Sequence, residues 1–149
     1  MLSIDEIDGK ILKELLRDGR LSYRQVASRI GVAVGTVQSR IRKMEERGII
    51  RGYSVLLDYE KLGYTITVVT EITVSKGKLL ETEKAVAELP LTCAVYDVTG
   101  LTDSIVVAKF KNREELSSFT KGLLEMPYVE RTNTHVVLAT HKEDFNLPI

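Results

Sequence analysis

Short polar and basic side chains gather in one segment of the chain, residues 35–43. The group combines hydroxyl, amide and cationic side chains with one glycine: Gly35, Thr36, Gln38, Ser39, Arg40, Arg42 and Lys43. Hydroxyl and amide groups hydrogen-bond to the edges of base pairs, whereas Arg and Lys neutralise phosphates. This set of side chains therefore suits non-covalent recognition of a nucleic acid.

A helix is needed to present these groups on one side. Apolar residues recur here every three or four positions, as Val34, Val37, Ile41 and Met44. At 100° per residue they occupy roughly 80° of the helix circumference, which predicts one buried stripe. The polar residues fall on the opposite arc or at its edges, except Arg40, which points sideways towards a phosphate backbone or another helix.

Two helices precede this one, and the second of them, which is short, completes a helix-turn-helix pattern with it. Capping boxes predict where they begin: Ser3 with Glu6, and Ser22 with Gln25. Ala27 is small enough for the next helix to cross closely, and Gly31 permits the positive φ of a turn. We expect the third helix to lie in the major groove of double-stranded DNA, with Arg24 adding a phosphate contact.

The charge supports this interpretation only when the chain is divided. The net charge of all 149 residues is +0. Residues 1–52 nevertheless carry 11 Lys and Arg against 7 Asp and Glu, whereas the remainder carries 10 against 14. The excess of basic residues in 1–52 and of acidic residues in the remainder indicates that the two parts bind different partners. The alternatives are a chance scatter of charge and a solvated three-helix bundle whose polar arc faces water.

After residue 50 the apolar period changes to two, which indicates strands. Strands are predicted at residues 51–57, 65–74, 94–99, 104–110 and 129–140, and helices at 78–89 and 112–126. After the linker strand the order is βαββαβ, the ferredoxin-like arrangement. The prediction is an α+β chain with a helix-turn-helix domain at 1–50, a linker strand at 51–63 and a ferredoxin-like domain at 64–149. One face of such a sheet stays bare, and its valines and isoleucines favour a second copy of the chain as partner.

Several classes of function are disfavoured. The single cysteine, Cys93, allows neither an internal disulfide nor a cysteine-based zinc cluster, and we expect it to be a small buried hydrophobe. His135 and His141 have no ligand cluster around them, so no metal and no other cofactor is predicted. The chain lacks a secretory signal and an apolar run of ~18 residues, which favours a cytoplasmic protein without a membrane partner. It also lacks the phosphate loop or nucleophile–base pair of a small-molecule enzyme.

Short motifs follow one another in a specific order along the whole chain. In the first half they are Ile4-Asp5-Glu6-Ile7-Asp8, Asp18-Gly19-Arg20-Leu21-Ser22, Val26-Ala27, Gly31-Val32, Arg40-Ile41 and Gly48-Ile49-Ile50. In the second half they are Leu62-Gly63-Tyr64, Val98-Thr99-Gly100, Asp103 and Val129-Glu130-Arg131-Thr132. Their order and spacing resemble the Lrp/AsnC family, also called feast/famine regulatory proteins. The last ten residues are similar to archaeal members.

The resemblance implies a DNA-binding transcription regulator with a winged-type helix-turn-helix and an effector and oligomerisation domain. It implies pseudo-palindromic operators, and dimers that assemble into tetramers, octamers or larger rings. It further implies an amino acid bound between dimers that changes assembly or DNA affinity. Glutamine or lysine is expected, because the stretch from Thr132 to Thr134 is similar to members that bind such ligands.

An amino-acid ligand needs donors for its carboxylate and an acceptor for its ammonium group. The candidate residues lie on the central hairpin and the last strand: Tyr96, Thr99, Gly100, Leu101, Asp103, Thr132 and Thr134. Gly100 lets a ligand approach backbone amides, and Asp103 can accept from the ammonium group. Thr132 and Thr134 place their hydroxyls on one face, at positions where similar proteins contact ligand. The alternative is that Asp103 only stabilises the turn and that both threonines are ordinary strand residues.

Three residues depart from the family pattern. Ala33 stands where a serine usually caps the recognition helix and Gly35 stands inside that helix, each costing about 1 kcal/mol of helix stability. Thr102 replaces an aromatic residue before Asp103, in the region of the ligand pocket. The sequence therefore also allows a second function, that of an effector-independent architectural protein that wraps or bridges DNA.

Overall fold

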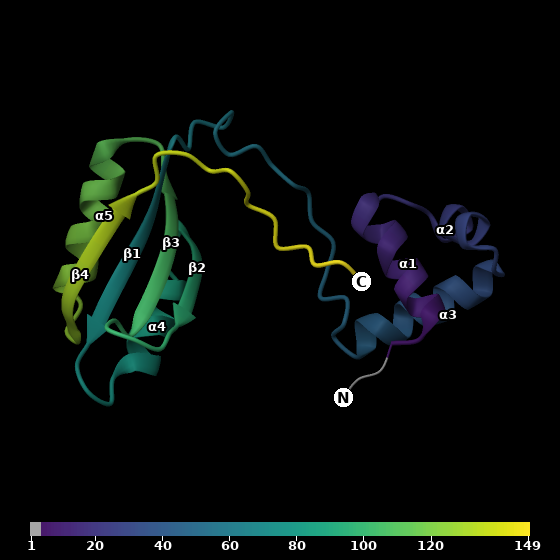
Figure 1. Cartoon of the computed structure of the whole chain (residues 1–149), viewed down its shortest axis with the longest axis horizontal. Helices are drawn as coiled ribbons and strands as arrows, with labels where there is room; N and C mark the ends of the chain where they lie inside the picture. Colours follow the sequence, from purple (N-terminus) through teal and green to yellow (C-terminus); the bar gives the residue numbers. More distant parts are fainter. Residues whose placement is uncertain (1–3) are drawn as a thin grey trace. The chain divides into compact units, whose positions relative to one another are not determined.

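Two separate hydrophobic clusters organise the chain, which is described by a computed structural model over residues 4–149 (Figure 1). One compact unit comprises the residues up to Leu56 together with Glu143–Ile149, and the other comprises Leu57–Lys142. Among the described residues, no helix is both long enough and apolar enough to cross a membrane.

The first unit contains three helices: α1 (Glu6–Arg17), α2 (Tyr23–Ile30) and α3 (Val34–Glu46). The capping box of Ser22 with Gln25 is confirmed at the start of α2, and Gly31 ends that helix at φ 74°. The capping box expected at Ser3 involves a residue outside the described range. The N-cap of α1 is Asp5, whose carboxylate accepts from the Asp8 amide while the Asp8 side chain accepts from the Asp5 amide.

The buried stripe of α3 packs on both other helices. Val37, Ile41 and Met44 are almost fully buried, and they share a core with Ile11 of α1 and Val26 of α2. The small Ala27, which is 3% exposed, lies in the same core. Val34 was expected in this stripe, but the prediction was wrong: its side chain is 43% exposed. Val34 is the first residue of α3, so the core formed by the later turns does not extend to cover it.

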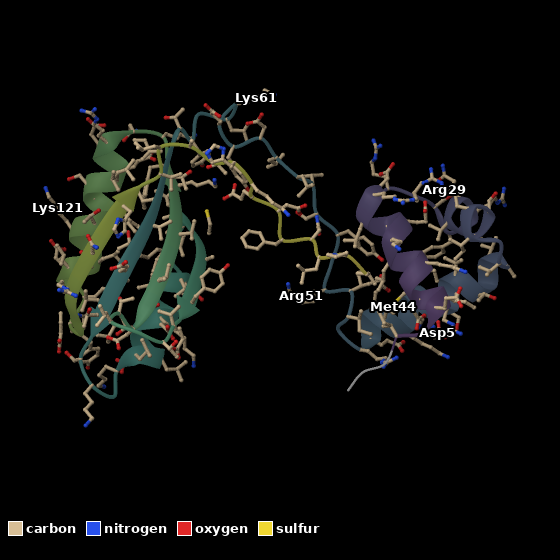
Figure 2. The ribbon with its side chains drawn as sticks, viewed as in Figure 1. Asp5, Arg29, Met44, Arg51, Lys61 and Lys121 are labelled. Carbon is tan, nitrogen blue, oxygen red and sulfur yellow. The ribbon has the colours of Figure 1, made fainter. Side chains whose placement is uncertain are left out.

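An ionic contact joins α3 to the start of α1. The Arg40 guanidinium donates to both Asp5 and Asp8, with 3.2 Å between Nη1 and Asp8 Oδ1. The Asp8 side chain is only 9% exposed, so the pair is shielded from water on one side. Figure 2 labels Asp5, which is the N-cap residue of α1, and Met44, which belongs to the buried stripe of α3. The contact fixes the rotation of α3 about its own axis, because Arg40 lies beside the buried stripe.

The second unit confirms the ferredoxin-like order βαββαβ. Its elements are β1 (Ile66–Val74), α4 (Leu79–Ala87), β2 (Thr92–Asp97), β3 (Ser104–Phe110), α5 (Arg113–Glu125) and β4 (Val129–Val136). The strands form an antiparallel sheet in the order β2-β3-β1-β4, so β2 and β4 are its two edges. Asn112 caps α5 by accepting from the Glu115 amide, as its sequence predicts.

Helices α4 and α5 cover only one face of this sheet. Val68, Ile72, Val106 and Phe110 alternate towards them and are buried with Leu123 of α5. The opposite face carries the intervening residues, which the strand register places side by side: Val69 opposite Val107, and Glu71 opposite Ile105. These residues are only partly buried, since no element among the described residues covers that face. The bare face predicted from the sequence is therefore present.

Three sequence expectations need correction. The linker strand expected at 51–63 forms no ladder, and residues 51–62 are exposed, because a strand requires a hydrogen-bonded neighbour that the described residues of the single chain do not supply. The last strand ends at Val136, four residues before Thr140, where its pairing with β1 ends. Cys93 is exposed, because it lies on edge strand β2 at an irregularity in the pairing with β3.

Replacing Arg40 by Gln should lower the melting temperature of the first unit more than replacing Arg42 by Gln. The first change leaves the shielded Asp8 carboxylate without its cation, whereas Arg42 pairs only with Glu46 in an exposed i,i+4 contact. Thermal unfolding followed by circular dichroism checks this, and equal losses for the two variants would contradict it.

The contact of Arg40 with Asp5 and Asp8 also makes the stability of the first unit depend on pH. The Asp8 amide, and next the Arg40 guanidinium, hold the pKa of Asp5 below its usual value of 3.8. A carboxyl group whose pKa is lowered by folding stabilises the fold above its unfolded pKa, and the gain is lost as the pH falls through the folded pKa. The difference in melting temperature between the wild type and Arg40→Gln should therefore be complete at neutral pH and shrink once the pH falls below 3.8. A difference that stays constant throughout an acid titration would refute this contribution.

Candidate nucleic-acid interface and ligand site

The outer face of α3 is polar, basic and open to solvent. Its exposed residues are Gly35, Gln38, Ser39, Arg42 and Lys43, and Thr36 beside them is half-buried. Arg24 of α2 is also exposed. These residues need no help from a second chain to be presented, because the buried residues on the other side of α3 already orient the helix. The arrangement can offer hydrogen-bonding groups along one helix face with cations nearer its C-terminal end.

The first turn of α3 lacks two features that usually stabilise a helix. Ala33 occupies the N-cap position and makes no side-chain hydrogen bond. A Cβ atom added at Gly35 would meet no atom within 4 Å, and no positive φ is recorded there. Neither the backbone nor the packing of this chain therefore requires a glycine at position 35. Together the two residues cost the helix roughly 2 kcal/mol relative to a serine cap and an alanine.

The two arginines of α3 have different surroundings. Arg42 Nε lies 2.9 Å from Glu46 Oε1, in a pair whose side chains are 79% and 60% exposed. Such a pair contributes little and is readily exchanged for another anion. Arg40 is instead held by Asp5 and Asp8, and its pKa is raised first by the hydrogen bond to Asp5. Of the two directions expected for Arg40, the structure shows the contact with another helix, because Asp5 and Asp8 at the start of α1 hold its guanidinium. A contact between Arg40 and DNA stays a prediction.

A contact after α3 was missed by the sequence reasoning. The Tyr53 hydroxyl donates to Glu45 Oε1 at 2.9 Å. Partial loss of water around the hydroxyl and this hydrogen bond to Glu45 raise the pKa of Tyr53 to about 12, although its side chain is 56% exposed as a whole. The contact ties the segment that follows α3 back to that helix. The alternation of apolar residues around position 53 predicted a strand, and it gave no indication that Tyr53 contacts Glu45.

In the second unit, the hairpin between β2 and β3 is fastened to β1. Asp103 Oδ2 accepts from the Val74 amide at 2.8 Å, and the Asp103 amide donates to the Ile72 carbonyl at 3.0 Å. The Thr102 hydroxyl donates to the same carbonyl at 2.8 Å. Thr102 was noted from the sequence only as a departure from a family pattern, and the structure gives it this anchoring role. Asp103 therefore stabilises the hairpin, with one carboxylate oxygen already in use.

Thr132 and Thr134 lie on β4, on the face of the sheet that carries the helices. Thr132 pairs with Ile72 of β1, and Thr134 pairs with Thr70. The Thr134 and Thr70 hydroxyl oxygens are 3.1 Å apart, and Thr70 is completely buried. The sequence analysis missed this contact, although a threonine that interrupts the apolar face of β1 is a signal from which a polar partner could have been predicted. Asp103, the residue before β3, and Thr132 of β4 thus flank Ile72 from its two sides.

The remaining ligand candidates are not brought to this place. Tyr96 of β2 pairs with Ile105, and so it lies on the bare face, opposite to the two threonines. Thr99, Gly100 and Leu101 form the exposed end of the hairpin, where the Leu101 side chain is 98% exposed. Within one chain the seven candidates therefore divide between two faces of the sheet and a loop.

Replacing Asp103 by Ala should destabilise the fold by about 1–3 kcal/mol, because the Val74 amide loses its acceptor. Asn at this position keeps an oxygen that can accept and should retain much of that stability. Urea unfolding at neutral pH measures both variants. Asp97→Ala, which removes an exposed carboxyl at the end of β2, is the matched control. A loss no larger for Asp103→Ala than for Asp97→Ala would show that the anchor contributes nothing.

Comparison with known proteins agrees with this division into two parts. Residues 4–51 match the family model for winged helix-turn-helix DNA-binding domains, and residues 67–147 match the Lrp/AsnC ligand binding domain. An uncharacterised HTH-type transcriptional regulator of Pyrococcus abyssi is 49% identical over 97% of this chain and 98% of its own length. The HTH-type transcriptional regulator FL11 of Pyrococcus horikoshii is 40% identical over 98% of this chain and 97% of its own.

Solved structures show the same architecture. A transcriptional regulator of Neisseria meningitidis, in complex with L-Met, is 27% identical with a TM-score of 0.89, covering 98% of this chain and 97% of that one. LrpC of Bacillus subtilis is 28% identical with a TM-score of 0.83, covering 97% of this chain and all of that one. The relatives and solved structures named here are transcription regulators and not enzymes. The chain belongs to the Lrp/AsnC family of helix-turn-helix transcription regulators.

Proposed function

We propose that this regulator reads its operator with the outer face of α3 and that a small amino acid, bound by the second unit, modulates the binding. The observation that carries the proposal is the division of α3 into a fully buried stripe and an exposed polar arc. A helix held in this way presents its outer residues to the major groove without rearrangement.

The exposed residues of α3 divide into two kinds of DNA contact. Thr36, Gln38 and Ser39 carry short polar groups that reach base edges, whereas Arg42 and Lys43 contact phosphates. Arg24 extends the phosphate contacts from α2. A second copy of the chain, paired through the bare face of the sheet, would present two such helices to a pseudo-palindromic operator. Further association of dimers into tetramers, octamers or larger rings is part of the same proposal.

Arg42→Ala and Lys43→Ala should weaken binding to all duplexes about equally. Each lost phosphate contact should flatten the dependence of log affinity on log salt by about 0.9. Ser39→Ala should instead reduce discrimination between operator variants with little change in that slope. Fluorescence anisotropy at several salt concentrations measures both effects. Lys121→Ala, at an exposed position of α5 (Figure 2), is the control that should change neither.

Gly35→Ala should stabilise the protein and weaken its binding to DNA. Alanine favours a helix over glycine by about 1 kcal/mol, and the added Cβ meets nothing inside the chain. A groove wall that approaches the helix at this point would meet the new methyl group. Gly122→Ala on α5 is the matched control, since its Cβ is also unobstructed and should stabilise without affecting DNA binding. Unchanged DNA affinity of Gly35→Ala would remove position 35 from the interface.

The ligand is proposed to lie near Thr132, on the edge strand β4. The Thr132 hydroxyl can donate to a carboxylate, and Gly100 of a neighbouring copy of the chain, in an assembly of dimers, gives access to backbone amides at its hairpin. The relative from Neisseria meningitidis was solved with L-Met, which supports an amino acid as the chemical class. Because Thr132 and Thr134 offer polar groups, we propose glutamine or lysine as the effector. The free Oδ1 of Asp103 is the acceptor for the ammonium group.

Thr132→Val should abolish a thermal shift produced by the effector. The change keeps the shape and removes the hydroxyl, so the fold and DNA binding should persist. Thermal-shift titrations of the wild type against the twenty amino acids, followed by the same titration of the variant, measure this. Thr92→Val, on the opposite edge strand, is the control. An equal response from wild type and Thr132→Val would place the ligand elsewhere.

A second function is favoured by one observation. Asp103 already accepts from the Val74 amide, and Thr102 is bound to the Ile72 carbonyl, so the hairpin is anchored without any ligand. An effector-independent architectural protein would need no more than this. It would bind DNA with the same dependence on salt, yet none of the twenty amino acids would shift its melting temperature or its DNA affinity.

A further inference from the structure

We infer that Val34 reads a thymine, through the C5 methyl group that thymine presents in the major groove. The inference rests on the proposed placement of α3 in that groove and identifies a specificity-determining residue there. Val34 is an apolar side chain on the DNA-reading helix that remains 43% exposed, outside the core that buries Val37 and Ile41.

The N-cap and the first two residues of α3 offer no hydrogen-bonding side chain. Ala33, Val34 and Gly35 are all exposed and carry only methyl groups or hydrogen. Base edges in the major groove are otherwise donors and acceptors, and the thymine methyl group is the apolar exception. An apolar side chain placed against any other edge would remove water from a polar group without replacing its hydrogen bond. The favourable partner for Val34 is therefore thymine.

The next turn of the helix points to the same kind of base pair. Gln38 is four residues after Val34, so the two side chains are neighbours on one face of α3. Gln38 is exposed, and a glutamine amide can make two hydrogen bonds to the N6 and N7 atoms of adenine. Val34 and Gln38 thus recognise the two members of A·T pairs. The operator half-site should contain A·T pairs side by side at the position where α3 enters the groove.

Replacement of thymine by uracil tests the inference, because it removes the methyl group and leaves base pairing intact. High-affinity duplexes are first selected from a randomised library with the full-length protein. Each thymine of the selected half-site is then replaced by uracil, and the dissociation constant is measured by fluorescence anisotropy. At one position the replacement of thymine by uracil should weaken the binding of the wild-type protein about fourfold, which is the effect expected for one buried methyl group.

The decisive measurement couples this position to residue 34. Val34→Ala should bind the thymine and uracil duplexes equally, whereas Val34→Ile should keep the preference for thymine. Leu16→Ala, which truncates an exposed apolar residue of α1, should behave as the wild type. If Val34→Ala retains the full preference for the thymine duplex over the uracil duplex, the inference is overturned. The inference is also overturned if Val34→Ala leaves this preference unchanged and instead alters the oligomeric state measured by sedimentation. Absence of binding to any duplex would overturn the proposed function, and the inference with it.

Discussion

The burial of one stripe of α3 is the constraint on which the first unit depends. Val37, Ile41 and Met44 are removed from water by α1 and α2, so the helix has only one stable rotation about its axis. Arg40 reinforces that rotation from the side by pairing with Asp5 and Asp8. The polar residues on the remaining arc are consequently presented outward. The surface proposed to meet DNA is therefore a consequence of packing, because it consists of the residues of α3 that the core leaves exposed.

Low helix stability coincides with the end of α3 that is proposed to read DNA. The uncapped Ala33, the unobstructed Gly35 and the exposed Val34 all lie in or beside the first turn of α3. Within the chain these residues gain nothing from packing. A surface selected to fit a partner commonly departs from the choices that would stabilise the isolated fold. The neighbouring turn, with Val37 and Ile41 fully buried, supplies the stability that the first turn lacks.

The second unit keeps its helices on one face and leaves groups for partners on the other face and at its edges. The bare face combines the partly buried Val69 and Val107 with a polar cluster in which Asn133 contacts Glu71 and His135. The hairpin, by contrast, is tied to β1 through Thr102 and Asp103. Its backbone is therefore fixed by contacts within the chain, without the ligand that is proposed to bind there. Such preorganisation lowers the entropy lost on binding.

Much of the fold could be predicted from the sequence, because local periodicity and capping are properties of neighbouring residues. The helix-turn-helix, the Ser22 cap, the turn at Gly31 and the order βαββαβ all follow from spacings of a few residues. The outer arc of α3 followed in the same way. What the tertiary structure decided depends on residues far apart in the chain: the capture of Arg40 by Asp5 and Asp8, the attachment of Asp103 to Val74, and the separation of Tyr96 from Thr132 on opposite faces. Periodicity identifies which residues share a face of one element, whereas strand register and helix crossing determine which of those faces meet.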